Sequence, residues 1–269
     1  MTRVVLFLTL LTCSHMALAD TVLVTGSNRG IGFQLVTQYA DAGWDVIATS
    51  RTPDDDDALQ ALAKRYPNVT IEALDVTNMT QIADLSARYA DKPIDVLINN
   101  AGLLGGRQGQ EWGNLSSDLF AQLMAVNVFG PLKVSEAFAA QVAASEQKKL
   151  IVISSTIGSI SRMQRPTPFP LLATSKAAVN MAMRTAAMQL KEQGVTVAMI
   201  MPGIVRTRMT YQAGGMSLEE ASQQTSFDID RPGSISAPES AERIIRVIAS
   251  LDGTDTGIFL DNDGSELNW

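Results

Sequence analysis

The stretch "VLVTGSNRGIG", Val22 to Gly32, decides the fold that this sequence predicts. An apolar run leads into Gly26, two more glycines follow at Gly30 and Gly32, and a helix-like segment begins there. Glycines let a backbone turn sharply and approach a diphosphate, whose charge meets the free N–H groups at a helix start. A tight turn without a ligand is the alternative. The pattern predicts a nucleotide-binding loop between a first strand and a first helix.

The rest of the chain alternates in the same way. Apolar, β-branched runs predict strands at 21–25, 45–49, 70–74, 94–98, 150–154, 196–201 and 258–261. Helix-like segments occupy 31–42, 55–66, 78–90, 117–146, 171–193 and 239–251. This order predicts an α/β fold: a single doubly wound Rossmann-type domain over 20–269, with a seven-stranded parallel sheet and helices on both faces.

Two segments interrupt the alternation. The Gly-rich segment 102–114 predicts a loop. The long polar segment 206–238 predicts a second loop, which would emerge at the carboxyl ends of the strands. Ligands of open α/β sheets bind at that edge, so this second loop is expected to cover a binding site.

Composition excludes some classes of function. The chain has 269 residues, of which 46% are hydrophobic and 18% charged, and its net charge is −7. Basic residues are scattered, which argues against a nucleic-acid-binding surface. The acidic run Asp54 to Asp57 predicts a solvated loop rather than a metal site, because adjacent acids repel each other and lack a ligating turn. No metal is predicted.

The first residues resemble an export signal. Arg3 precedes the apolar run Val4 to Leu11, and Ala17 to Ala19 form a small-residue cleavage site. The apolar run is shorter than the roughly 20 residues that span a bilayer, so no membrane span is predicted. Residues 1–19 are therefore expected to be a signal peptide, and the mature protein to be secreted or periplasmic.

The alternative is a translation start at Met16, which would give a cytoplasmic protein. Cys13 and His15 are the single cysteine and the single histidine of the chain. Cleavage or a start at Met16 would remove both. Thiol nucleophiles, histidine bases and zinc sites of the ordinary type would then be excluded.

The end of the second predicted strand indicates which dinucleotide binds. Enzymes that prefer NAD place an acid there to hold the ribose hydroxyl. Here the sequence is "ATSRTP", with Arg51 at that place, and Arg29 lies inside the glycine loop. Guanidinium groups bind a phosphate through two parallel hydrogen bonds. The pair predicts NADP(H) over NAD(H), the alternative being two surface arginines.

With these residues in place, the chain resembles the short-chain dehydrogenase/reductase family over 20–269. Further motifs that carry the resemblance are "LDVT", "INNAG", "MAVNVFGPLKV" and "MPGIVRT". The stretches "GIFLDNDGSELNW" and "SKAAVNMAMRT" resemble the C-factor and sniffer-type carbonyl reductases within that family. The resemblance implies a homodimer or homotetramer that is built through the helices near 117–146 and 171–193.

The resemblance also implies a cofactor site. Asp75 is expected to contact adenine, Lys176 the nicotinamide ribose and Thr207 the nicotinamide carboxamide. The expected cofactor-binding residues are Thr25, Gly26, Asn28, Arg29, Gly30, Ile31, Gly32, Arg51, Asp75, Val76, Asn99, Ala101, Gly102, Lys176, Pro202, Gly203, Val205 and Thr207.

The implied reaction is hydride transfer between nicotinamide C4 and a carbonyl or alcohol carbon of a small substrate. Ser155 matches the serine that binds the carbonyl, and Asn127 matches the asparagine of a water-linked proton path. Lys176 matches the lysine that lowers the pKa of a proton-donating tyrosine. The position of that tyrosine holds Leu172, in "PFPLLATSKAAVN".

Leucine donates no proton, and a positioned general acid contributes roughly 10²–10⁴ in rate. Tyr211, in the segment 206–238, is one candidate substitute. Arg162 or Arg165 would stabilise an alkoxide without giving up a proton. Lys176 itself would donate if burial beside a positive nicotinamide ring lowered its pKa.

Leu172 is expected to pack against the substrate or the nicotinamide, or otherwise to be a core residue. Two functions therefore follow from the sequence. The first is an NADP(H)-dependent oxidoreductase of a small apolar carbonyl or alcohol. The second is an NADPH-binding pseudoenzyme with a sensing or binding role.

Overall fold

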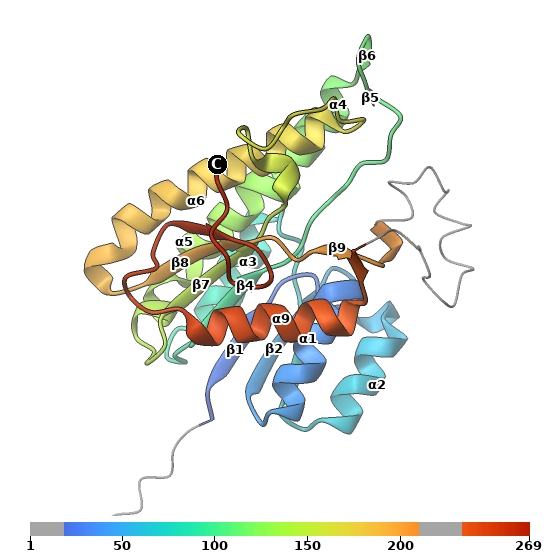
Figure 1. Ribbon diagram of the computed structural model, residues 1–269. Helices are drawn as coiled ribbons and strands as arrows, with labels where there is room; N and C mark the ends of the chain where they lie inside the picture. The colour runs from blue at the N-terminus through green and yellow to red at the C-terminus, as the bar shows by residue number, and fades with distance from the viewer. Residues whose placement is uncertain (1–18, 210–232) are drawn as a thin grey trace, which may run out of the picture.

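Seven parallel strands form the central sheet of the computed structural model, which describes residues 19–209 and 233–269 (Figure 1). Their order is β3-β2-β1-β4-β7-β8-β11. The strands are β1 (Thr21–Val24), β2 (Asp45–Ser50), β3 (Val69–Ala73), β4 (Val96–Asn99), β7 (Lys149–Ile153), β8 (Thr196–Ile200) and β11 (Ile258–Leu260). The predicted fold class and strand number are confirmed.

The sheet reverses its winding direction next to β1. The chain moves from β1 outward to β2 and β3, and then returns to β4 on the other side of β1. In open α/β sheets, ligands bind in the crevice outside the carboxyl ends of the strands, at such a switch point. The loops after β1 and β4 therefore border the place where a nucleotide is expected.

Helices cover both faces of the sheet, as Figure 1 shows. On one face α1 (Gly30–Asp41), α2 (Asp57–Arg65) and α9 (Ala237–Ser250) pack into one hydrophobic core. On the other face α3 (Met79–Arg88), α5 (Gly130–Ala143) and α6 (Pro170–Leu190) pack into a second core. In β1, Val22 and Val24 face the first core and Leu23 faces the second, which explains why the strands are apolar on both sides.

The long helix predicted at 117–146 is interrupted. It consists of α4 (Ser117–Met124), a π-helical turn over Ala125–Phe129, and α5. Single π-helical turns occur most often at functional sites, because the extra residue shifts a side chain relative to the helix face. Asn127 lies in this turn.

The segment 102–114 is not entirely loop, in contrast to the prediction. A short antiparallel hairpin pairs β5 (Gln110–Glu111) with β6 (Asn114–Leu115). In Figure 1 this hairpin projects from the carboxyl end of the sheet, next to α4. Gln110 at its base is fully buried, which anchors the hairpin to the domain.

The segment 206–238 is described at its two ends. β9 (Ile204–Val205), directly before this segment, pairs in parallel with β10 (Ser234–Ile235) inside it. Tyr211 lies outside the described residues, as does most of the proposed signal peptide. No helix within 19–209 or 233–269 is long and apolar enough to cross a membrane.

The C-terminal residues fold back onto the domain. Trp269 stacks on Phe259 of β11 with ring centroids 5.5 Å apart, and the Arg184 guanidinium lies 5.0 Å from the centroid of the Trp269 ring. Ser159 Oγ donates a hydrogen bond of 2.7 Å to the Asn268 carbonyl. The tail therefore supports the loop that follows β7.

Gly158 controls how closely that loop approaches α6. A Cβ at this position would lie 2.6 Å from the carbonyl carbon of Lys176 and 2.8 Å from the Ala177 nitrogen. We expect Gly158→Ala to push the two segments apart and to lower the free energy of unfolding by about 1–3 kcal/mol in urea denaturation. Gly253→Ala is the matched control, because no atom lies within 4 Å of its Cβ position. Equal stability of the two variants would contradict the close packing.

Candidate active site

Two glycines bring the loops after β1 and β4 into direct contact. Gly26 has φ +70°, and a Cβ there would lie 2.9 Å from Ala101 Cα. A Cβ on Gly32 would lie 2.3 Å from the Gly26 carbonyl oxygen and 2.4 Å from Asn100 Nδ2. Larger residues would separate the loops, since these distances are far shorter than normal carbon contacts. The three-glycine motif thus forms a cradle in which Gly26 and Gly32 place no side chain between the two loops.

Asn100 ties the two loops together. Its Nδ2 donates to the Thr25 and Gly26 carbonyls at 2.9 Å and 3.0 Å. Thr25 Oγ1 in turn accepts the backbone N–H groups of Asn100 and Ala101. The sequence analysis did not single out Asn100, although it lies inside the quoted "INNAG" segment. The structure thus makes Asn100, in addition to the predicted Thr25 and Ala101, part of the cradle.

The side chain of Asn99 lies away from this cradle. Its Nδ2 donates a 3.0 Å hydrogen bond to Ser135 Oγ of α5, and the residue is 2% exposed. Asn99 was expected to bind the cofactor. In the structure its side chain instead joins the sheet to α5.

The N-terminus of α1 points into the crevice. The helix begins at Gly30, directly after the loop, with no acidic residue in its first turn and no side-chain cap from Arg29. Backbone N–H groups at such a helix start are available to an anion. Ile31 is in the same first turn. These features fit a diphosphate.

The Pro-Gly segment lies over the glycine loop. A Cβ on Gly30 would lie 3.6 Å from Thr207 Cγ2. The Pro202 carbonyl is held by Ser240 Oγ at 2.7 Å, and Val205 is buried in β9. The structure therefore brings together the glycine loop and the segment that was predicted to hold the nicotinamide.

Three arginines lie close together beside the glycine loop. Burial lowers the pKa of Arg29, and the nearby charges of Arg208 and Arg51 lower it further, whereas Asp56 opposes the shift. Both arginines predicted for the 2′-phosphate therefore lie near each other. Arg208, which the sequence analysis did not identify, joins them from the segment after β9.

Asp75 belongs to the same end. Burial by itself would raise the pKa of Asp75, but hydrogen bonds from Thr77 Oγ1 and N, together with the Arg51 charge, lower the pKa. Val76 packs against Gly130, where a Cβ would come within 3.0 Å of its side chain. The predicted adenine contact is thus placed next to the arginines.

The acidic run after β2 differs from the prediction in one residue. Asp54, Asp55 and Asp57 are exposed, but Asp56 is partly buried. One Asp56 oxygen accepts a hydrogen bond from Asn28 Nδ2 at 3.1 Å, and the other accepts the Ser50 hydroxyl. The expected solvated loop is therefore wrong for Asp56. Among residues that the structure describes, no group of three or more Asp, Glu, His or Cys side chains is placed to hold a metal ion.

Lys176, Asn127 and Gly102 meet at the other end of the crevice. Lys176 Nζ donates a 2.9 Å hydrogen bond to the Ile153 carbonyl at the end of β7. A Cβ on Gly102 would lie 4.0 Å from Lys176 Nζ and 3.6 Å from Asn127 Oδ1. The Asn127 amide also bonds both backbone polar groups of Leu103, at 2.7 Å and 2.9 Å. Burial lowers the pKa of Lys176 to about 8.

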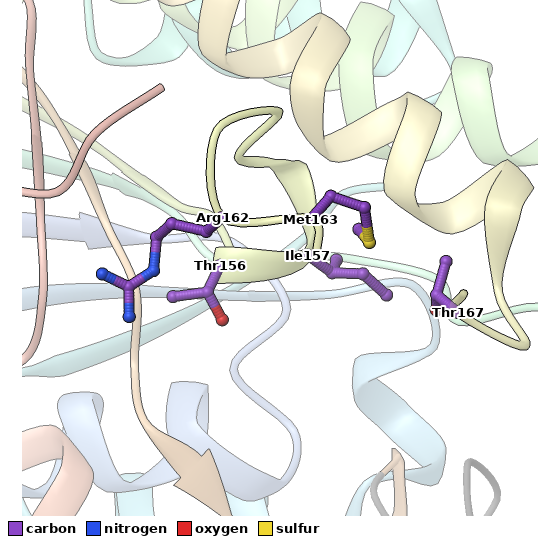
Figure 2. Close-up of a pocket in the computed structure, with 5 residues that line it drawn as sticks. All are labelled: Thr156, Ile157, Arg162, Met163 and Thr167. Atoms are coloured by element: carbon purple, nitrogen blue, oxygen red, sulfur yellow. The ribbon is translucent and has the colours of Figure 1, made fainter. Parts of the chain in front are cut away.

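Ser155 follows Ile153 closely and shares this end of β7. It starts a 3-10 turn, and its Oγ accepts the Ile157 N–H at 3.3 Å. A hollow of about 350 Å³ opens directly after it. Figure 2 shows that Ile157, Met163 and Thr167 occupy one side of this hollow, while Thr156 and Arg162 occupy the other. Arg165 is exposed and does not line the hollow.

Leu172 is a buried residue of α6 on the turn before Lys176. It is 9% exposed and packs in an apolar cluster with Leu104, Leu123, Phe169 and Leu171. Its backbone N–H donates to the Gln110 side-chain oxygen at 3.0 Å. Gln110, which the sequence analysis did not identify, uses its Nε2 on the Leu104 and Gly106 carbonyls.

Comparison with known proteins identifies the family. The short chain dehydrogenase family matches residues 20–216. The chain belongs to this family. A short chain dehydrogenase of Penicillium aethiopicum is 32% identical over 258 residues, which cover 93% of this chain and 99% of that protein. Membership supports an oxidoreductase activity.

Solved structures agree with this short-chain dehydrogenase fold. The NADPH-bound carbonyl reductase from chicken fatty liver is 29% identical, with a TM-score of 0.81 over 93% of this chain and 99% of that one. A short-chain dehydrogenase/reductase of Burkholderia multivorans with bound NADP is also 29% identical, with a TM-score of 0.77 over 93% and 100% of the two chains. These neighbours favour NADP among the nicotinamide cofactors.

Lys176 should make the stability of this short-chain dehydrogenase depend on pH. Its folded pKa of about 8 is below the ordinary value of 10.5, so between these limits the unfolded chain binds the proton and the folded chain does not. Stability must then rise with pH in this window, by at most about 1.4 kcal/mol per pH unit. Urea denaturation from pH 7.5 to 9.5 should show this rise in the wild type and its loss in Lys176→Met.

Lys191→Met, at an exposed lysine after α6, controls for the removal of one positive charge. It should keep the pH dependence of the wild type. A pH profile that Lys176→Met leaves unchanged would show that the Lys176 ammonium is not desolvated.

Proposed function

We propose that this short-chain dehydrogenase is an NADP(H)-dependent reductase of a small, apolar carbonyl substrate. The observation that carries the proposal is the contact that joins the glycine loop, with Arg29 beside Arg51, to the Asn100–Gly102 segment, which in turn reaches Lys176 at the end of β7. Each part suits a different part of one dinucleotide and its substrate. The reverse reaction, oxidation of the corresponding alcohol, uses the same groups.

The chain's residues fit the cofactor at three places. The α1 N-terminus and the glycine cradle fit the diphosphate. Arg29 and Arg51 fit a 2′-phosphate, and Lys176 fits the nicotinamide ribose through its ammonium. When bound, NADP(H) supplies or accepts the hydride at the nicotinamide ring. That the chicken and Burkholderia neighbours contain NADPH and NADP supports this choice.

The hollow after Ser155 supports the substrate class. Ile157 and Met163 offer apolar contacts, while Thr156 offers a hydroxyl near the start of the same turn. Ser155 Oγ would hold the carbonyl oxygen and orient the carbon toward the cofactor. Arg162, at the polar side, would stabilise developing negative charge without giving up a proton.

Lys176 is the group on this chain that fits the role of proton donor in place of a tyrosine. With a pKa of about 8, it carries a proton at pH 7 and yields it more readily than an ordinary lysine does. Leu172, at the tyrosine position of the family pattern, offers no such group. Tyr211 remains a predicted alternative that lies outside the described residues.

The second candidate is an NADPH-binding protein without turnover. The favouring observation is the environment of Leu172, which packs among Leu104, Leu123 and Phe169 and leaves no polar side chain at that position. In that case the cofactor half of the crevice would serve for sensing or binding. Turnover of the wild-type protein separates the two candidates: the second predicts tight NADPH binding without turnover, together with activity that appears in Leu172→Tyr.

Leu172→Tyr is expected to raise kcat for NADPH-dependent carbonyl reduction by about 10²–10⁴ if the missing acid limits the rate. Leu172→Phe is the matched control, since it adds the ring without the hydroxyl and should leave kcat unchanged. NADPH oxidation across aldehydes, quinones and diketones measures both variants. Equal rates of the Tyr and Phe variants would show that the acid is not limiting.

The wild-type rate of carbonyl reduction is expected to fall as pH rises through about 8, because Lys176 then loses the proton that it would donate. Lys176→Arg keeps a positive charge that does not titrate in this range, so residual activity should lose the pH dependence. NADPH affinity, measured in parallel by fluorescence, separates a cofactor defect from a proton-transfer defect. A flat wild-type profile between pH 6.5 and 9.5 would remove Lys176 as the donor.

Membership of the sniffer-type subgroup, oligomerisation and export remain proposals. The tail that returns Trp269 onto Phe259 supports a role for the C-terminal motif used for the subgroup assignment. Met181 and Met188 of α6 are each 67% exposed and lie seven residues apart on one face, which supports a dimer through this helix. The signal peptide over 1–19 and the alternative start at Met16 stay predictions from the sequence.

A further inference from the structure

The turn after β2 returns an acid to the end of that strand. β2 ends at Ser50, Arg51 follows on the surface, and a 3-10 turn over Pro53–Asp55 reverses the chain. Asp56 then lies against the strand end again. The turn therefore places a carboxylate beside the end of β2, where Arg51 occupies the position of an acid in enzymes that prefer NAD.

The Asp56 carboxylate bonds the glycine loop and β2 rather than its own helix. Asp56 occupies the N-cap position of α2, but its side chain makes no capping hydrogen bond there. Its two oxygens instead accept hydrogen bonds from Asn28 Nδ2 and from the Ser50 hydroxyl. One of these donors belongs to the glycine loop and the other to β2, which border the expected adenosine ribose.

Positive and negative side chains therefore lie close together around Arg29. Arg29, Arg51 and Arg208 contribute positive charge, and Asp56 is the carboxylate that acts directly on Arg29. A ribose 2′-hydroxyl can donate a hydrogen bond to a carboxylate. A 2′-phosphate can only accept hydrogen bonds from its neighbours when fully ionised, and a carboxylate beside it repels its charge.

We propose that Asp56 is a specificity-determining residue that weakens the preference for NADP(H) and allows NAD(H) to bind as well. The inference rests on the proposed function, because it assumes that a nicotinamide dinucleotide occupies the crevice. Arg29 and Arg51 attract the 2′-phosphate, and Asp56 partly cancels that attraction.

The test compares adenosine fragments that lack the nicotinamide, so that catalysis plays no part. Binding of 2′,5′-ADP and of 5′-AMP to the full chain is measured by isothermal titration calorimetry. Asp56→Asn should tighten 2′,5′-ADP binding about five- to thirtyfold and leave AMP binding equal or weaker. Asp55→Asn is the matched control: it removes the same charge from an exposed neighbour and should change either affinity less than about twofold.

NADPH and NADH are then titrated by fluorescence. In Asp56→Asn, the affinity for NADPH should increase relative to the affinity for NADH, as for the two adenosine fragments. Thermal unfolding confirms that each variant is folded. If Asp56→Asn does not fold, Asp56→Ser removes the charge while keeping a hydroxyl, and the same increase in 2′,5′-ADP affinity is expected. Asp56→Glu, which keeps the charge, should keep the ratio near the wild-type value.

Three results would overturn the inference. An unchanged ratio, or an equal loss of affinity for both fragments, would mean that Asp56 only ties Asn28 to Ser50. An equal increase of 2′,5′-ADP affinity in Asp55→Asn would mean that any charge removed from the acidic run has the same effect. Wild-type protein that binds neither NADPH nor NADH would overturn the proposed function, and the inference with it, which is a result distinct from the first two.

Discussion

The backbone contact between the ends of β1 and β4 is the constraint on which the rest of the site depends. Gly26 and Gly32 have no side chains to hold these segments apart, and the Asn100 amide binds the Thr25 and Gly26 carbonyls at once. A buried backbone carbonyl without a partner costs free energy, so Asn100 both joins the loops and satisfies them. The glycine cradle is a consequence of that contact. Gly102 lies near Lys176 Nζ because it follows Asn100 and Ala101, which the contact holds in place.

The two ends of the crevice use charge in different ways. At the end that holds Arg29, the charges of Arg208 and Arg51 lower the pKa of Arg29 and the Asp56 carboxylate opposes that shift, so positive and negative charge are balanced there. At the other end, Lys176 is stabilised by a carbonyl, and burial is the cause of its lowered pKa. A carboxylate partner would favour the charged form and raise that pKa. The absence of such a partner from the contacts of the Lys176 ammonium is what brings its titration near neutral pH.

The sequence could predict what periodicity and glycine spacing determine. The seven strands and the glycine loop follow from local patterns that the parallel sheet preserves. Ser155, Asn127 and Lys176 were instead expected from the family resemblance. Long-range placement could not be predicted in the same way. Nothing in the acidic run marks Asp56 as the inward residue, because its direction depends on the 3-10 turn before it. Gln110 was likewise hidden in a segment predicted to be a loop.

The surroundings of Leu172 show which contacts hold the first turn of α6 in place. The first turn of α6 needs partners for its free N–H groups, and Gln110 supplies one of them to the backbone of Leu172, whatever side chain that residue carries. The side chain itself packs with leucines from other segments, which an aliphatic residue satisfies fully. Helix position, cofactor cradle and Lys176 are therefore held by contacts that do not involve a hydroxyl at residue 172. The packing of this part of α6 is therefore independent of any hydroxyl at residue 172, and a change of side chain there can alter proton transfer without moving Lys176 from the end of β7.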